Sequence, residues 1–211
     1  MERIASFISG FQRFREKFFT GEDSPYRELQ DSQSPHSLVI ACSDSRVDPA
    51  IVFDAQPGEL FVVRNVANLV PPYVSDGGTH GVSAALEFGV RALKVRHIII
   101  MGHSHCGGIQ ALLNSTGGEF ISQWMKTAEQ AVRHAAAKSS DPEERTRECE
   151  LASIRNSLDN LMTFPWIRER VESSDLRLHG WYFDLEHGRL EGFDRTQGAF
   201  VQMIADSKHS G

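Results

Sequence analysis

Two short segments contain the residue types that bind metals and move protons. Residues 42–46 read CSDSR, and residues 102–108 read GHSHCGG. Thiolate sulfur and imidazole nitrogen are donors that zinc prefers, usually in tetrahedral geometry. Because two residues separate His103 from Cys106, one loop could wrap both donors around a single ion. With Cys42 as the third donor, the two segments predict a zinc site.

The fourth position around the metal has two interpretations. Water there would make the site catalytic, whereas the Asp44 carboxylate there would close it. Two thiolates cancel the formal charge of the ion, so water would be acidified less than at a site of neutral ligands. A second group should then help to remove the proton, and Asp44 is placed for that. A bidentate pair with Arg46 would keep Asp44 ionised and off the metal, so these two are the predicted catalytic residues.

The elements that must position these residues are strands and helices in alternation. Each segment follows a continuous apolar run, which is typical of a buried strand. If the first strand continued past Cys42, then Asp44 and Arg46 would face the same way as the thiol. Strands are expected over residues 38–41, 60–64, 97–101 and 176–193, the last with a turn at 187–188. Helices are expected over residues 80–93, from 109, over 119–138, and over 148–171 with a break near 165.

This order predicts an α/β fold with a central, mostly parallel β-sheet flanked by helices and an antiparallel edge strand. Sites in open α/β sheets form at the carboxyl ends of the strands, so the two segments should converge there. The length of 211 residues favours a single domain over 1–211. The net charge of −6 argues against a nucleic-acid partner. No apolar run has the length of a membrane span, and three cysteines cannot carry a disulfide scaffold.

Residues 1–20 predict an amphipathic helical arm. Ile4, Phe7, Ile8, Phe11 and Phe14 recur at helical spacing, and charged residues interrupt any signal-like core. Binding to a membrane surface is the less favoured interpretation, because the net charge offers little to anionic lipid. The helix is expected to dock on its own body or on a neighbouring subunit. Without a signal peptide, a reducing cytoplasm is the expected location.

The two segments resemble those of the β-class carbonic anhydrases. The resemblance runs from about residue 30 to residue 185, and QPGE at 56–59 with FVVRNVAN at 61–68 is similar to the plant-type branch. It implies a zinc-dependent hydro-lyase for the reversible hydration of carbon dioxide to bicarbonate and a proton. The matching zinc ligands are Cys42, His103 and Cys106, and the matching dyad is Asp44 and Arg46.

The resemblance also implies a substrate pocket and an oligomer. Gln33 matches a glutamine that reaches the pocket from a neighbouring subunit, so a homodimer or a higher homo-oligomer is expected. Phe61 matches an apolar wall residue, and Phe88 stands where the branch has a tyrosine. Gly107 is assigned to the ligand loop beside the substrate.

One branch of the family binds bicarbonate at a non-catalytic site through Trp, Arg and Tyr. Arg64 is present here, but Val39 and Phe183 stand at the other two positions. We therefore expect that site to be poorly supplied and the resting metal site to be open near neutral pH.

Three alternatives remain beside carbon dioxide hydration. The same zinc site could hydrolyse carbon disulfide or carbonyl sulfide, or a closed site could make the chain a non-catalytic zinc protein. A cysteine-nucleophile enzyme is disfavoured by the acidic Asp44 beside Cys42. Among the remaining residues, His105 reads as a polar loop residue rather than a proton shuttle, His80 has no evident partner, and Cys149 reads as a structural thiol.

Overall fold

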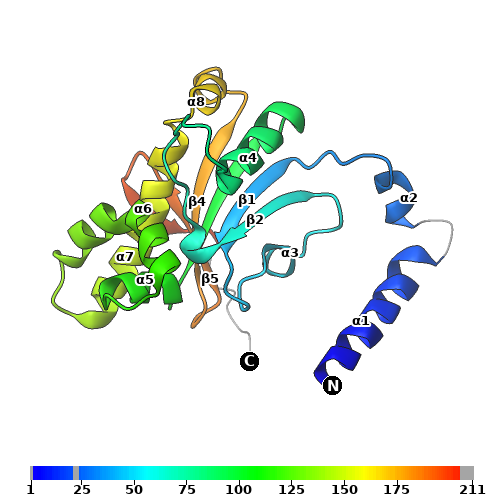
Figure 1. The fold of residues 1–211 in the computed structure, drawn as a ribbon, viewed down its shortest axis with the longest axis horizontal. Coiled ribbons are helices and arrows are strands. Elements are labelled where there is room, and N and C mark those ends of the chain that lie inside the picture. Colours follow the sequence, from blue (N-terminus) through cyan, green and yellow to red (C-terminus); the bar gives the residue numbers. More distant parts are fainter. Residues whose placement is uncertain (1, 21–23, 205–211) are drawn as a thin grey trace.

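Six strands form one sheet in the computed structural model, which describes residues 2–20 and 24–204 (Figure 1). Their order is β2-β1-β3-β4-β5-β6, and β2, β1, β3 and β4 run parallel while β5 and β6 are antiparallel. The bounds are β1 Ser37–Cys42, β2 Leu60–Asn65, β3 His97–His103, β4 Arg177–Asp184, β5 Arg189–Asp194 and β6 Ala199–Gln202. The predicted mostly parallel sheet with an antiparallel edge is confirmed.

The helices follow the predicted order, with short additions. Their bounds are α1 Glu2–Phe19, α2 Pro25–Leu29, α3 Pro49–Val52, α4 Gly81–Glu87, α5 Gly107–Leu113, α6 Glu119–Ala136, α7 Pro142–Leu161 and α8 Pro165–Glu172. A 3₁₀ turn spans Val66–Asn68, and a π-helical turn over Phe88–Ala92 continues α4. Met1 of the predicted arm, and residues 21–23 and 205–211 of the predicted domain, lie outside the described residues.

The apolar strands are buried on both faces. Leu38 and Ile40 of β1 belong to one core cluster, and their neighbours Val39 and Ala41 belong to a second. Side chains alternate between the two faces of a strand, so covering both faces requires a continuous apolar run rather than an alternating one. Residues of α4, α7 and α8 pack in the first cluster, and residues of α5, α6 and α7 pack in the second.

One helix begins earlier than the expected residue 148. Asp141 caps α7 by accepting a hydrogen bond from the Glu144 N–H at 2.8 Å, and Pro142 stands at the first helical position. A capping aspartate followed by proline and acidic residues is a strong signal for a helix start. The polar composition of 139–147 concealed that signal. Helix α3 and the edge strand β6 were not predicted from the sequence.

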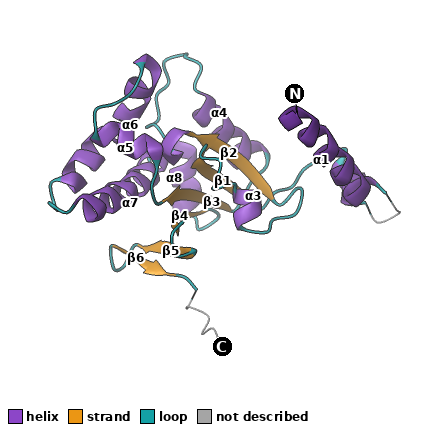
Figure 2. Ribbon diagram, turned by 90° about the horizontal axis from the view of Figure 1, so that it is seen from below, coloured by secondary structure: helices purple, strands orange, loops and turns teal. Residues whose placement is uncertain are grey.

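The predicted N-terminal helix is present as α1, and it stands away from the body of the chain in both views (Figures 1 and 2). Its apolar residues Ile4, Phe7, Ile8 and Phe11 are 61–72% exposed. Within one chain, α1 therefore does not dock on the rest of the molecule, and its apolar face is exposed. Within the described residues, no helix combines the length and the apolar character that crossing a membrane requires.

The strand ends converge as expected. Cys42, the last residue of β1, pairs with Asn65 at the end of β2, and Ala41 pairs with Met101 near the end of β3. Both predicted segments therefore leave the sheet at its carboxyl edge, side by side.

Candidate metal centre

Three buried donors meet at this edge of the sheet. Cys42 ends β1, His103 ends β3, and Cys106 precedes the first turn of α5. Their ligand atoms all lie within 4.8 Å of one another. The exposed fractions are 5% for Cys42, and 1% each for His103 and Cys106. The structure thus brings together all three predicted ligands in a group that could hold a metal ion.

The histidine is oriented for coordination. Its Nδ1 lies 2.8 Å from the Ser104 carbonyl oxygen, and a carbonyl can only accept. Nδ1 therefore carries the proton, and Nε2 presents a lone pair. That Nε2 is buried without a hydrogen-bond partner. A metal ion would satisfy this otherwise orphaned nitrogen, and a backbone carbonyl is a usual partner for the other nitrogen of a ligating histidine.

The two thiols have opposite proton affinities. A hydrogen bond from Cys106, opposed by burial and aided by His103, lowers the pKa of Cys42 to about 4. Because Cys106 supplies that hydrogen bond, and because it is buried, its own pKa is raised. Burial opposes protonation of His103, but the adjacent Cys42 thiolate raises its pKa overall. Cys42 is therefore the thiol that ionises first, and a divalent cation bound by all three groups would displace their remaining protons.

The predicted dyad is formed, by a turn rather than by a strand. Arg46 donates from Nε to Asp44 Oδ1 at 2.9 Å and from Nη2 to Oδ2 at 2.7 Å. The expectation that the strand continues past Cys42 is wrong, because the Val47 N–H donates to the Asp44 carbonyl at 3.2 Å and closes a turn. Hydrogen bonds from Arg46 hold the pKa of Asp44 well below its usual range. Both carboxylate oxygens are thus engaged away from the three donors.

Arg64 holds the same loop from the neighbouring strand. It donates to the Cys42 carbonyl at 3.0 Å, to the Asp44 carbonyl at 2.6 Å and to Asp48 Oδ2 at 2.9 Å. Val39 is fully buried on β1 and offers no polar atom from its side chain. The arginine is therefore occupied with backbone and carboxylate oxygens, and the poor supply of the non-catalytic bicarbonate site stays a prediction.

A strained turn closes the site on the β2 side. Ala67 has φ 63° and Asn68 has φ 49°, a region that costs a non-glycine residue on the order of 1–2 kcal/mol. The Ala67 backbone hydrogen bond contributes to the low pKa of Cys42. A Cβ atom on Gly108 would approach Val66 Cγ1 to 2.8 Å, so the glycine lets α5 come close to this turn.

A buried carboxylate that was not predicted from the sequence contacts the second ligand loop. Glu150 of α7 accepts hydrogen bonds from the Cys106 N–H at 2.9 Å and from the Tyr182 hydroxyl at 2.8 Å. A signal was available, because Glu150 shares a helical face with the buried Ile154, Ser157 and Leu161. A charged residue on such a face usually has a specific partner.

The predicted substrate-pocket residues divide into two groups. Gly107 follows Cys106 directly and lies at the metal centre. Phe61 pairs with Leu38 at the other end of β1, four residues and about 13 Å along the sheet from Cys42. Phe88 packs against Phe61 with ring centroids 5.9 Å apart, and Gln33 is exposed just before β1. One chain does not bring these three to its own metal centre, so their substrate role stays a prediction that requires a second chain.

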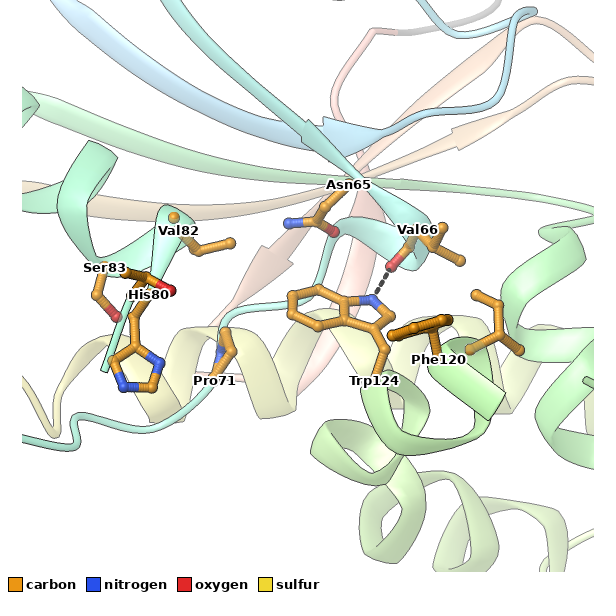
Figure 3. Close-up of a pocket in the computed structure, with 11 residues that line it drawn as sticks. Asn65, Val66, Pro71, His80, Val82, Ser83, Phe120 and Trp124 are labelled. Carbon is orange, nitrogen blue, oxygen red and sulfur yellow. Dashed lines mark hydrogen bonds between the residues drawn. The ribbon is translucent and has the colours of Figure 1, made fainter. Parts of the chain in front are cut away.

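An apolar hollow of about 470 Å³ lies beside the centre rather than within it (Figure 3). Asn65 and Val66 form its wall nearest the site, and Phe120 of α6 lies across from His80. The Trp124 indole N–H donates to the Val66 carbonyl at 2.7 Å and fixes the ring in the wall. None of the three metal donors lines this hollow.

The remaining singled-out residues are explained by local contacts. His105 is exposed between the two ligands, with φ 56°, and its carbonyl accepts from Arg46 at 3.3 Å. His80 does have a partner, contrary to expectation, because its Nε2 lies 2.8 Å from Asp76 Oδ1. Cys149 is buried and donates to the Val132 carbonyl at 3.3 Å, and burial raises its pKa to about 11.

Fold and site together define an α/β protein with a candidate Cys-His-Cys metal centre at the carboxyl edge of its sheet. The carbonic anhydrase family matches residues 37–190, which is most of the chain. The chain belongs to that family, in its β class.

Individual relatives agree with this assignment. The chain is 43% identical over 180 residues to "Beta carbonic anhydrase 5, chloroplastic" of Arabidopsis thaliana, and the match covers 82% of this chain and 59% of that protein. The chain thus spans less than two thirds of that relative's length. Among solved structures, the β-carbonic anhydrase CcaA superposes with a TM-score of 0.88 at 33% identity, covering 98% of this chain and 94% of that one. A tetrameric β-carbonic anhydrase of Sordaria macrospora superposes with a TM-score of 0.81 at 29% identity, covering 95% and 100%.

Proposed function

We propose that the chain is a zinc-dependent carbonic anhydrase, a hydro-lyase that interconverts carbon dioxide and bicarbonate with release of a proton. The observation that carries this proposal is the buried group of two thiols and one imidazole, with the free Nε2 of His103 aimed into it. Membership of the carbonic anhydrase family supports the reaction. Zinc is the metal proposed because two sulfur donors and one nitrogen donor suit a borderline-soft, tetrahedral ion.

Cys42, His103 and Cys106 would hold the zinc and leave one position open. Zinc, when bound, acidifies water and so supplies a nucleophile for the carbon of carbon dioxide. His103 and Cys106 are buried, so their loop closes one side of the metal centre to substrate. Carbon dioxide would therefore reach the metal from the side where Asp44 lies.

Asp44 orients the proton of the nucleophile. Its Oδ1 accepts from the backbone N–H and the Nε of Arg46, whereas Oδ2 accepts one bond from Nη2 and has a lone pair to spare. Because Arg46 keeps the pKa of Asp44 low, the carboxylate accepts a hydrogen bond without retaining the proton. The proton then passes to solvent, to which the Arg46 side of the site is open.

A second copy of the chain would complete the substrate pocket. Gln33, Phe61 and Phe88 lie near the amino end of the sheet, at a distance from their own metal centre. A homodimer or a larger homo-oligomer could carry them to the centre of the neighbouring chain, and the exposed apolar face of α1 offers a surface for that contact. Assembly is supported by the tetrameric relative from Sordaria macrospora.

A cytoplasmic location is part of the proposal. All three cysteines are free thiols within the described part of the chain, and two of them are the proposed ligands. A reducing compartment such as the cytoplasm keeps thiol ligands from forming disulfides. Fractionation of cells that express the native protein, with an antibody against the chain, would place it there or in an organelle.

Stopped-flow measurement of carbon dioxide hydration by the zinc-loaded chain tests the function. We expect hydration far above the buffer rate, with carbonyl sulfide and carbon disulfide turned over much more slowly. Faster turnover of either sulfur compound would reassign the substrate. A fully zinc-loaded protein that is inactive across a pH series would instead indicate a non-catalytic metal site.

A further inference from the structure

Glu150 is a buried carboxylate that the proposed reaction does not use. It lies on α7 and is 3% exposed. Burying a carboxylate is costly unless hydrogen bonds and charges compensate, so a buried glutamate needs a structural or functional reason. Burial raises its pKa, and its two hydrogen-bond donors oppose that rise.

Both contacts of Glu150 are donors from elements that carry or flank the metal ligands. The Cys106 N–H donates to Oε1 at 2.9 Å, and the Tyr182 hydroxyl donates to Oε2 at 2.8 Å. A carboxylate presents an acceptor at each oxygen, whereas an amide of the same shape presents one acceptor and one donor group. A carboxylate therefore accepts both hydrogen bonds, whereas an amide could accept only one and would require the Tyr182 hydroxyl to turn and accept instead.

Arg147 of α7 links Tyr182, the second hydrogen-bond donor to Glu150, to strand β5. The Arg147 guanidinium lies 4.8 Å from the centroid of the Tyr182 ring. Its Nη2 donates to both carboxylate oxygens of Glu191 on β5, at 2.9 Å to Oε1 and 2.7 Å to Oε2. Arg147 and Glu150 are three residues apart on α7, so they share a face of that helix. A continuous set of contacts thus runs from β5 through α7 and β4 to the second ligand loop.

We propose that Glu150 is a positioning residue for the metal ligand Cys106. By holding the Cys106 N–H, it fixes the residue at φ −70° and ψ 115°, directly before α5. In that conformation the Cys106 sulfur lies within 4.8 Å of the ligand atoms of Cys42 and His103. The sulfur is then held toward Cys42 and His103 before any metal arrives.

This inference rests on the proposed function only in taking the Cys-His-Cys group as a metal centre. Partners that orient a metal ligand typically contribute 10- to 100-fold to metal affinity. The effect of Glu150 should therefore appear in metal release and in the electronic environment of the metal, whether or not the protein hydrates carbon dioxide.

The test compares Glu150→Gln with Glu148→Gln in the full-length, metal-loaded protein. Glu148 is on the same helix and makes only a loose pair with Arg155 at 3.9 Å, so it controls for loss of a charge on α7. The measurements are the rate of zinc transfer to a chelator and the thiolate-to-metal absorption bands of the cobalt-substituted protein. We expect Glu150→Gln to release zinc about 10 to 100 times faster and to change the cobalt bands, with Glu148→Gln unchanged.

A second variant tests for the specific hydrogen-bond pattern. In Glu150→Gln, the amide cannot accept from both donors, whereas removing the Tyr182 hydroxyl leaves only the Cys106 N–H to satisfy. Glu150→Gln combined with Tyr182→Phe should therefore recover part of the lost zinc retention. A merely structural defect would instead deepen in the double variant.

Two results would overturn the proposal. One is a folded Glu150→Gln protein whose zinc release stays within twofold of the parent and whose cobalt spectrum is unaltered. If Glu150→Gln does not fold, Tyr182→Phe alone decides, because it leaves the carboxylate with one donor: release should rise several-fold over the Glu148→Gln control, and an unchanged rate contradicts the proposal. A wild-type chain that binds no metal would overturn the proposed function as well, whereas a zinc protein without hydration activity would overturn the function alone.

Discussion

The two loops that supply the metal donors have opposite surroundings. The first, residues 42–46, opens to solvent, with the Arg46 side chain 53% exposed and that of Asp44 18% exposed. The second, residues 103–106, holds His103 and Cys106 at 1% exposure each. The side of the centre formed by residues 42–46 is therefore open to solvent, and the side formed by residues 103–106 is closed to it.

Each loop also has its own carboxylate, and the two carboxylates are shifted in opposite directions. Hydrogen bonds from Arg46 lower the pKa of Asp44, whereas burial raises the pKa of Glu150. A neighbouring cation and a desolvated cavity are distinct causes, and here they separate two acidic groups by role. In the proposed function Asp44 would serve the reaction, and in our further inference Glu150 would serve the placement of Cys106.

The largest effect should come from the buried loop. Cys106→Ser replaces a thiolate by a hydroxyl that zinc binds poorly, so we expect loss of bound zinc and at least a 100-fold loss of carbon dioxide hydration. Metal analysis and stopped-flow assays on the same preparation measure both. Cys149→Ser is the matched control, because that buried thiol donates to the Val132 carbonyl and is not part of the Cys-His-Cys group, so the variant should keep the zinc. Retention of one zinc per chain in Cys106→Ser would exclude this cysteine as a ligand.

The next effect should come from the open loop without loss of metal. Asp44→Asn keeps the shape of the side chain but replaces a carboxylate oxygen by an amide group. We expect zinc content to stay near the parent value and turnover to fall about 100-fold, which is within the range of acid–base assistance. Zinc content together with kcat tests this. Turnover within threefold of the parent would remove Asp44 from the reaction.

A smaller effect should follow from Arg46→Ala, which keeps most of the zinc and lowers turnover about tenfold. Without the guanidinium, the pKa of Asp44 should rise toward its ordinary value of about 3.9. A lowered pKa keeps the carboxylate ionised to more acidic pH, so the variant should lose activity earlier as pH falls toward 4. A pH profile of kcat measures the shift. Arg91→Ala breaks an exposed pair with Glu87 and should behave as the parent. A fully active Arg46→Ala protein would contradict the dyad.

The smallest effect should come from Arg64, which braces the open loop through its backbone. Arg64→Met removes three hydrogen bonds and leaves the loop carbonyls of Cys42 and Asp44 to water. We expect the free energy of unfolding to fall by about 2 kcal/mol and turnover to fall a few-fold, with zinc retained. Urea unfolding of the zinc-loaded protein measures the loss. An unchanged unfolding midpoint would mean that water replaces the three hydrogen bonds of Arg64 without loss of stability.

The sequence was informative where neighbouring residues determine the outcome. The donors of both loops and their strands were readable because buried parallel strands have continuous apolar runs and the ligands follow them directly. The dyad was also readable, although the strand continuation assumed for Asp44 and Arg46 was wrong. A single turn, closed by Val47, brings them together instead.

Contacts between distant residues were not readable. Glu150 is 44 positions from Cys106, and Arg64 is 20 positions from Asp44, so only the packed fold shows that they hold the two loops. The positive φ of Ala67 has no local signal either, because alanine rarely adopts it without tertiary contacts to enforce it. The placement of Phe61 about 13 Å along the sheet from Cys42 likewise depends on strand register.

Zinc content per chain, measured beside the carbon dioxide hydration rate on the same preparation, tests the central claim most directly. The proposed function predicts about one zinc per chain, with hydration that disappears when a chelator removes the metal and returns when zinc is restored. Hydration that persists without metal, or a stoichiometric zinc protein with no hydration at any pH, would contradict it.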